Sequence, residues 1–173
     1  MNYPLDLIPY DLVKVNFNVS EFIYDKNAPV PLDVLNAIVR YHLMPVNVAR
    51  NDLGFPVIVS QSSGYRTVEH EKSMGRTGTS LHCFGTHIPK LKDRPEHYRK
   101  GAVDYTCSRI NLEKLFLALI RVGYTRICFY PDKYFFHCDY FSDRPMWYEA
   151  TPEGKWVQRR TDVMILNIRK AIA

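Results

Sequence analysis

Hydrophobic positions along this chain of 173 residues follow a helical period in some stretches and an extended one in others. Apolar side chains recur every three to four positions over residues 31–49, which predicts an amphipathic helix interrupted at Pro45 and ended at Gly54. The same spacing over residues 111–123 predicts a second helix. It is expected to be capped by Asn111 and ended by a glycine.

Between these helices the pattern changes to short apolar runs bounded by turn residues, which are typical of buried strands. Such runs occupy residues 56–60, 101–106, 125–130 and 134–140, and the turn Pro131-Asp132-Lys133 joins the last two as a hairpin. Short helices are expected near 68–74 and from Thr161 onward. This order favours an α+β fold with a mainly antiparallel central sheet flanked by helices. Neither a repeat nor a low-complexity linker divides the sequence, so residues 1–173 are predicted to form one domain.

The run Tyr134-Phe135-Phe136-His137-Cys138-Asp139-Tyr140 carries an imidazole and a carboxylate two residues apart. Alternate residues of a strand point to the same face, so His137 and Asp139 are expected to project together and Cys138 to the opposite side. Burying two titratable side chains without a partner is costly. This strand therefore predicts a binding partner on its polar face.

Composition narrows the setting in which the chain works. It is 46% hydrophobic, which is enough for a sizeable core, and contains no run of about 20 apolar residues that would span a membrane. The first residues lack the basic and apolar pattern of a secretory leader, so synthesis and folding in a cytoplasm are expected. Four cysteines without a Cys-x-x-Cys pair indicate reduced, mostly buried thiols.

The charge indicates anionic surroundings. A formal charge of +5 and an isoelectric point near 9.0 suit nucleic acid or an acidic polymer such as a cell wall, and a generically basic surface is the alternative. No recognition-helix pattern or aromatic RNA-binding motif accompanies the charge, so a nucleic-acid module ranks lowest. The chain is expected to act as a monomer without a nucleic-acid partner.

Three side chains on or beside the expected strands suit a catalytic zinc site: His82, Asp104 and His137. Such sites take three protein ligands from histidine, aspartate or glutamate and leave a fourth position to water. No His-Glu-x-x-His motif is present, so spacing alone does not identify these ligands. His42 and His70 are expected at the surface or on a helix face.

Four short motifs follow one another along the chain: Ser63-Gly64-Tyr65-Arg66, Ser80-Leu81-His82, Gly101-Ala102-Val103-Asp104 and Phe136-His137-Cys138-Asp139. In this order they resemble the zinc D-alanyl-D-alanine carboxypeptidase family, which includes VanY-type peptidases and phage cell-wall endopeptidases. The resemblance covers about residues 16–148 and leaves 149–173 as a C-terminal tail. It implies the fold of that family, which is shared with the hedgehog signalling domain.

The resemblance also implies a role for each motif. Zn²⁺ would be held by His82, Asp104 and His137. Arg66 would bind the substrate carboxylate or the developing oxyanion, and Ser80 would line the substrate site. A zinc ion so placed would activate water and polarise the scissile carbonyl.

The general base is the assignment with most alternatives. Asp139 is the first choice because strand geometry places it beside His137. It is nearly as well explained as a carboxylate that orients the ligand imidazole. Asp132, in the hairpin turn, is the second choice of base. Some relatives place an acidic residue three positions before the last histidine, where this chain has Tyr134.

One insertion separates this chain from the family pattern. The twenty-two positions from His82 to Asp104 exceed the usual spacing, and residues 86–100 read as an exposed basic excursion. His87 and His97 lie in that excursion and are expected to be exposed rather than extra ligands. Gly101 is favoured over Gly85 as the motif glycine, because the motif alanine and aspartate follow it.

Two functions are compatible with these expectations. The first is a zinc metallopeptidase that hydrolyses peptidoglycan stem or cross-link peptides, as carboxypeptidase or endopeptidase, for example in phage lysis or entry. The alternative is a catalytically inactive zinc-binding relative that serves as a binding module. Peptidoglycan stem peptides are anionic, which agrees with the basic charge.

Overall fold

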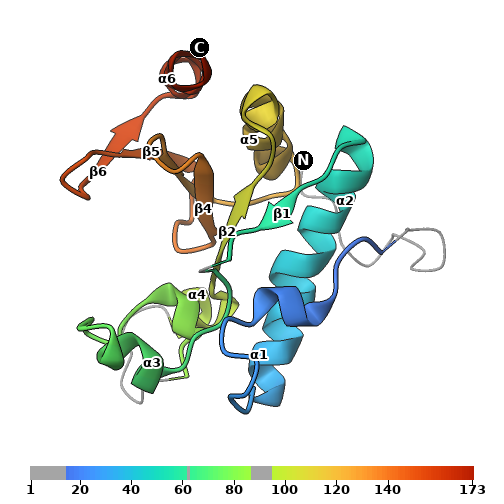
Figure 1. Ribbon diagram of the computed structural model, residues 1–173, viewed down its shortest axis with the longest axis vertical. Helices are drawn as coiled ribbons and strands as arrows, with labels where there is room; N and C mark the ends of the chain where they lie inside the picture. The colour runs from blue at the N-terminus through green and yellow to red at the C-terminus, as the bar shows by residue number, and fades with distance from the viewer. Residues whose placement is uncertain (1–14, 62, 87–94) are drawn as a thin grey trace.

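The computed structural model describes residues 15–61, 63–86 and 95–173 (Figure 1). Its helices are α1 (Leu32–Ala37), α2 (Met44–Leu53), α3 (Val68–Ser73), α4 (Pro95–Lys100), α5 (Leu112–Arg121) and α6 (Thr161–Ile172). Its strands are β1 (Ile58–Val59), β2 (Ala102–Thr106), β3 (Arg126–Tyr130), β4 (Phe135–Asp139), β5 (Met146–Ala150) and β6 (Trp156–Arg159). The N-terminal residues and most of the basic excursion, including His87, lie outside the described residues.

The six strands form one sheet in the order β1-β2-β4-β3-β5-β6. All neighbours are antiparallel except β3 and β5, which run parallel. The predicted α+β class with a mainly antiparallel sheet is therefore confirmed, as is the hairpin between β3 and β4. Residues 149–173, which the resemblance leaves as a C-terminal tail, contain the end of β5, all of β6 and α6, and α6 is the helix expected from Thr161.

Pairing register divides the sheet into an apolar and a polar face. Phe136 on β4 stacks on Phe116 of α5, with ring centroids 5.8 Å apart, and Trp147 on β5 meets the same ring edge-on at 5.7 Å. α5 thus covers the apolar face, with α6 beside it (Figure 1). Because neighbouring strand residues alternate, His137 and its β2 partner Asp104 project from the opposite face.

The long N-terminal helical segment is built in three parts. A π-helical turn over Ile38–Leu43 separates α1 from α2, and Pro45 stands in the first turn of α2 without an N–H to donate. The carbonyl of Tyr41, four residues earlier, accepts from the Tyr140 hydroxyl at 2.8 Å. Gly54 ends the segment with a left-handed φ of +70°. The predicted stop at Gly54 is confirmed. The predicted interruption at Pro45 is not found, because the segment continues through that residue and only changes from π- to α-helix just before it. No helix in the described ranges is long and apolar enough to cross a membrane.

α5 starts differently from the prediction. A 3-10 turn over Arg109–Asn111 leads into the helix, and the Asn111 side chain makes no capping bond. Its amide instead donates to the Ser108 hydroxyl at 2.9 Å. Gly123 follows the helix with a φ of +98°, as expected of its stop.

His42 is buried in the core, which corrects the prediction of a surface or helix-face residue. Its Nε2 donates to the Lys100 carbonyl at 2.8 Å, and its Nδ1 accepts from the Tyr124 hydroxyl at 3.2 Å. The neutral imidazole therefore links α4, through its last residue, to the core. Burial lowers the pKa of His42 to about 3, although the Lys100 carbonyl opposes this shift.

This buried imidazole is expected to make the protein acid-sensitive. Below the unfolded-state pKa of about 6.5, only the unfolded chain protonates His42, so this residue lowers stability by about 1.4 kcal/mol per pH unit until the folded pKa is reached. Urea unfolding from pH 4.5 to 7.5 measures this slope. His42→Gln is expected to remove about that much from the slope, while His70→Gln, at a partly exposed position, keeps the wild-type profile. Parallel profiles for wild type and His42→Gln would contradict the assignment.

Candidate functional site

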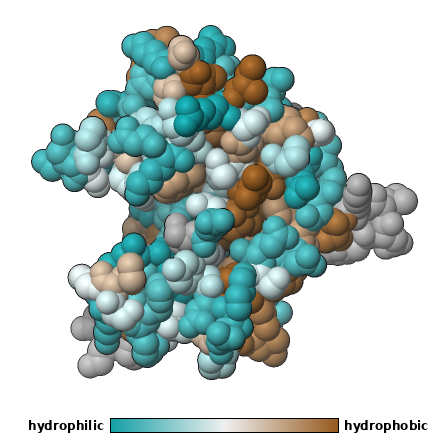
Figure 2. Space-filling view, in the orientation of Figure 1, coloured by the Kyte–Doolittle hydropathy of each residue, from teal (hydrophilic) through white to brown (hydrophobic). Residues whose placement is uncertain are grey.

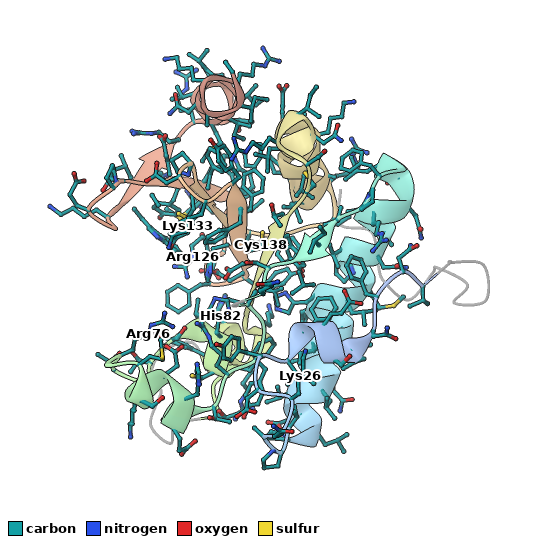
Figure 3. The ribbon with its side chains drawn as sticks, in the orientation of Figure 1. Lys26, Arg76, His82, Arg126, Lys133 and Cys138 are labelled. Carbon is teal, nitrogen blue, oxygen red and sulfur yellow. The ribbon has the colours of Figure 1, made fainter. Side chains whose placement is uncertain are left out.

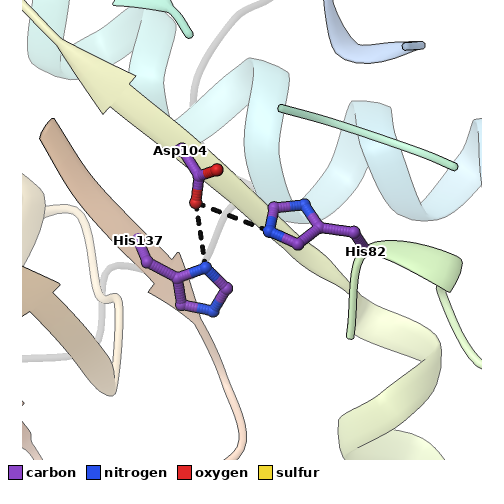
Figure 4. Close-up of side chains that lie close together, drawn as sticks. All are labelled: His82, Asp104 and His137. Carbon is purple, nitrogen blue, oxygen red and sulfur yellow. Dashed lines mark hydrogen bonds and ion pairs between the residues drawn. The ribbon is translucent and has the colours of Figure 1, made fainter. Parts of the chain in front are cut away.

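Three buried side chains converge on the polar face of the sheet: His82, Asp104 and His137 (Figure 4). β2 and β4 pair Asp104 directly with His137, and the imidazole Nδ1 lies 2.9 Å from Asp104 Oδ1. His82 approaches from the loop after α3, with Nε2 at 3.5 Å from the same oxygen. The structure thus brings together all three residues that the sequence nominated as metal ligands.

A hydrogen bond to a backbone carbonyl fixes the ring of His82. Its Nδ1 donates to the Gly64 carbonyl at 3.2 Å, which leaves Nε2 with a lone pair toward Asp104. Gly64 has a φ of +85°, and a Cβ there would lie 2.2 Å from the Phe22 carbonyl oxygen, so only glycine fits. Ser80 accepts from the backbone N–H of His82 at 3.3 Å. The Ser-Gly-Tyr-Arg and Ser-Leu-His motifs therefore act together to orient one imidazole.

A carboxylate fixes the ring of His137. Its Nε2 lies 3.0 Å from Asp139 Oδ2, which leaves Nδ1 toward Asp104. Asp139 is fully buried and receives a forked pair of hydrogen bonds from Arg126, Nε and Nη2 both lying within 2.9 Å. The N–H of Phe141 also donates to Asp139. This geometry favours the orienting role over the general-base role of Asp139, because its oxygens are already engaged behind the imidazole.

The three ligand atoms fit a metal ion. They all lie within 4.8 Å of one another, and the corners of a tetrahedral zinc site are about 3.3 Å apart when each ligand is about 2.0 Å from the ion. Two imidazole nitrogens and one carboxylate oxygen are a known donor set for catalytic zinc, and each imidazole has its other nitrogen tied to an acceptor. The His82-Asp104-His137 group could therefore hold a metal ion.

Burial and charge act in opposite directions on these groups. Burial lowers the pKa of His82, opposed by Asp104. Burial would also lower the pKa of His137, but the hydrogen bonds that its ring donates to Asp104 and Asp139 outweigh burial and raise this pKa to about 9. Burial would raise the pKa of Asp104, yet the two imidazoles hold it well below its usual range. Asp104 is thus ionised, as a ligand carboxylate must be.

The cluster opens into a cleft of about 530 Å³ between the sheet and the loop around α3. Figure 2 shows a hollow at this edge of the molecule, and Figure 3 places Arg126 and Lys133 on the sheet side and Arg76 on the other, with His82 between them. Four cationic side chains line the cleft against two carboxylates: Arg66, Arg76, Arg126 and Lys133 against Glu71 and Asp104. Its field is therefore positive even without a metal ion.

Arg66 and Ser80 both line the cleft, as their predicted substrate-binding roles require. The Nε of Arg66 lies 3.1 Å from Glu71 Oε1 but makes no hydrogen bond, whereas Arg76 donates to the same oxygen at 2.8 Å. Glu71 thus neutralises only part of the positive charge around it. Asp132, the second choice of base, lies exposed in the β3–β4 turn and does not line the cleft.

Sequence patterns did not identify Trp156 as part of the aromatic wall of the cleft. Tyr130 closes β3 and Trp156 opens β6, and the indole N–H of Trp156 donates to the Tyr130 hydroxyl at 2.9 Å. An aromatic residue at a strand end gives no signal that separates a cleft from a core. The four cysteines are buried free thiols, and Cys138 points to the apolar face as predicted.

The contacts of Asp139 give a direct test of its role. Asp139→Asn is expected to weaken Zn²⁺ binding about 10- to 100-fold, because the imidazole of His137 loses the carboxylate that orients it. Competition with a chromophoric chelator measures the affinity, and thermal unfolding verifies that the variant is folded. Asp132→Asn serves as the matched control and keeps wild-type affinity. Unchanged Zn²⁺ affinity in Asp139→Asn would contradict the orienting role.

Comparison of the chain with protein-family models, with curated proteins and with solved structures finds no match. The site is therefore characterised by its own geometry.

Proposed function

We propose that this protein is a zinc-dependent peptidase that hydrolyses peptide bonds in the stem or cross-link peptides of peptidoglycan. The observation that carries the proposal is the buried His82-Asp104-His137 group, in which each imidazole has one nitrogen tied to an acceptor and the other directed at Asp104. Such outer partners are typical of built metal sites. The resemblance of the surrounding motifs to zinc D-alanyl-D-alanine carboxypeptidases supports the same assignment.

Zinc bound there would polarise the scissile carbonyl of the substrate and activate a water molecule. The chain's own residues would bind and orient the peptide around that position. Arg66 and Arg76 share one carboxylate partner, Glu71, so positive charge remains for a carboxylate of the substrate. Lys133 lines the opposite side of the cleft. An anionic peptide lying between them would be held on both sides.

A binding module that uses zinc without hydrolysis is the second candidate. It is favoured because both carboxylates that line the cleft among the described residues are already engaged. Asp104 belongs to the metal cluster, and Glu71 is paired with two arginines. Asp139 lies behind His137 and is engaged by Arg126. A peptidase would require Glu71 or a group brought by the substrate to take the proton of water.

Digestion of purified peptidoglycan fragments separates the two candidates. The zinc-loaded protein is expected to convert muropeptides into products that have gained one water across a peptide bond, detected by mass spectrometry. Removal of the metal with a chelator is expected to abolish the reaction, and re-addition of Zn²⁺ to restore it. Arg66→Ala is expected to lower kcat/KM about 100-fold or more, because the cleft loses a cation that faces the reacting peptide.

Arg109→Ala provides the matched control, because this arginine lies over the Tyr134 ring in the loop before α5 and does not line the cleft. It is expected to leave the rate unchanged. Zinc-loaded protein that binds muropeptides and returns them intact would favour the binding module. Folded protein that takes up no zinc would contradict both candidates.

A further inference from the structure

Tyr130 and Trp156 form a hydrogen-bonded aromatic pair on the wall of the cleft. The indole Nε1 of Trp156 lies 2.9 Å from the Tyr130 hydroxyl oxygen. Trp156 belongs to β6, beyond the part of the chain that resembles the peptidase family. The Tyr130 ring is also stacked on Phe135, with centroids 4.5 Å apart. The pair is therefore held from two sides.

The pair stands next to the His82-Asp104-His137 group. Tyr130 is the cross-strand partner of Phe135, which makes it the diagonal neighbour of His137 on the same face of the sheet. The Trp156 ring lies 5.2 Å from the His137 ring, centroid to centroid. Tyr130 and Trp156 line the same cleft as the three candidate ligands. A molecule bound at the cluster would therefore lie within reach of this wall.

The hydrogen bond from Trp156 gives the Tyr130 oxygen the role of acceptor. An indole N–H only donates, so the Tyr130 oxygen accepts and its own proton is left for another acceptor. Within the described ranges, no protein acceptor for that proton lies at hydrogen-bonding distance. Burial raises the pKa of Tyr130 to about 12, opposed by the Trp156 bond, so the hydroxyl stays protonated at neutral pH. Tyr130 thus brings to the cleft wall a neutral donor for which the described residues offer no acceptor.

We propose that the Tyr130 hydroxyl donates a hydrogen bond to an anionic oxygen of the ligand bound beside the cluster, and that Trp156 is the positioning residue for that donor. The oxygen would belong to a carboxylate, a hydroxamate or the scissile carbonyl as it gains negative charge. The inference rests on the proposed function only in requiring a metal ion at the cluster. It adds a donor from the sheet to a cleft that Arg66 also lines, so that both groups would be available to the negative oxygen.

A purely structural role is the competing explanation, in which the pair only fixes β6 to β3. That role predicts lower stability when the pair is broken and no change in how tightly a ligand binds. The proposed role predicts weaker ligand binding and little change in stability when the Tyr130 hydroxyl is removed, because the stacking of its ring on Phe135 stays intact. Anion affinity at constant metal affinity therefore separates the two.

The test uses the full chain loaded with Co²⁺, whose visible absorption reports both metal and anion binding. Acetohydroxamate is titrated into wild type, Tyr130→Phe, Trp156→Phe and Tyr148→Phe. Tyr130→Phe is expected to weaken acetohydroxamate binding about 10- to 100-fold without altering Co²⁺ affinity, because one hydrogen bond to a charged oxygen is lost. Trp156→Phe is expected to give a smaller loss in the same direction, because it keeps an aromatic ring but frees the hydroxyl to rotate.

Tyr148→Phe is the matched control. Tyr148 lies beside Trp156, at 5.8 Å between ring centroids, but its hydroxyl donates to the Met146 sulfur and it does not line the cleft. It is expected to bind acetohydroxamate as wild type does. Equal acetohydroxamate affinity in Tyr130→Phe and wild type, with Co²⁺ bound in both, would overturn this inference and leave the proposed function standing. Failure of the wild type to bind Co²⁺ would overturn both.

Discussion

The pairing of β2, β4 and β3 in one register is the constraint on which the site depends. It sets Asp104 opposite His137 and Arg126 opposite Asp139, so that two acids, one imidazole and one guanidinium share a single face. A slip of one residue would turn these side chains into the apolar face and bring Phe136 out of it. The contact of Phe136 with Phe116 of α5 resists such a slip. Packing on one side of the sheet therefore holds the chemistry on the other.

Burial of so many titratable groups is tolerated because each has a partner. Asp139 is compensated by Arg126 and by His137, and Asp104 by both imidazoles. A buried carboxylate without such partners would cost several kcal/mol. These contacts form a chain from Arg126 through Asp139 to His137, and His137 presents its other nitrogen to Asp104. Polar contacts that stabilise the fold thus also aim the ligand atoms into the cleft.

Local sequence patterns predicted what local physics determines. The alternation of β4 placed His137 and Asp139 on one face, and Gly54 marked the end of the first helical segment. The parallel placement of β5 and the docking of β6 depend on contacts far apart in the chain, so Trp156 could not be connected with Tyr130 from the sequence. His42 was misplaced for the same reason, because its partners come from α4 and from Tyr124. Asn111 makes no capping bond, because its side-chain amide donates to the Ser108 hydroxyl instead.

The central claim is that His82, Asp104 and His137 form one metal site. X-ray absorption at the zinc edge, on protein reconstituted with one equivalent of Zn²⁺, tests it most directly. The account predicts nitrogen and oxygen ligands at about 2.0–2.1 Å, with scattering from two imidazoles. In His137→Ala, the signal of one imidazole and most of the bound zinc should be lost. Sulfur scattering at about 2.3 Å, or a spectrum unchanged in His137→Ala, would contradict it.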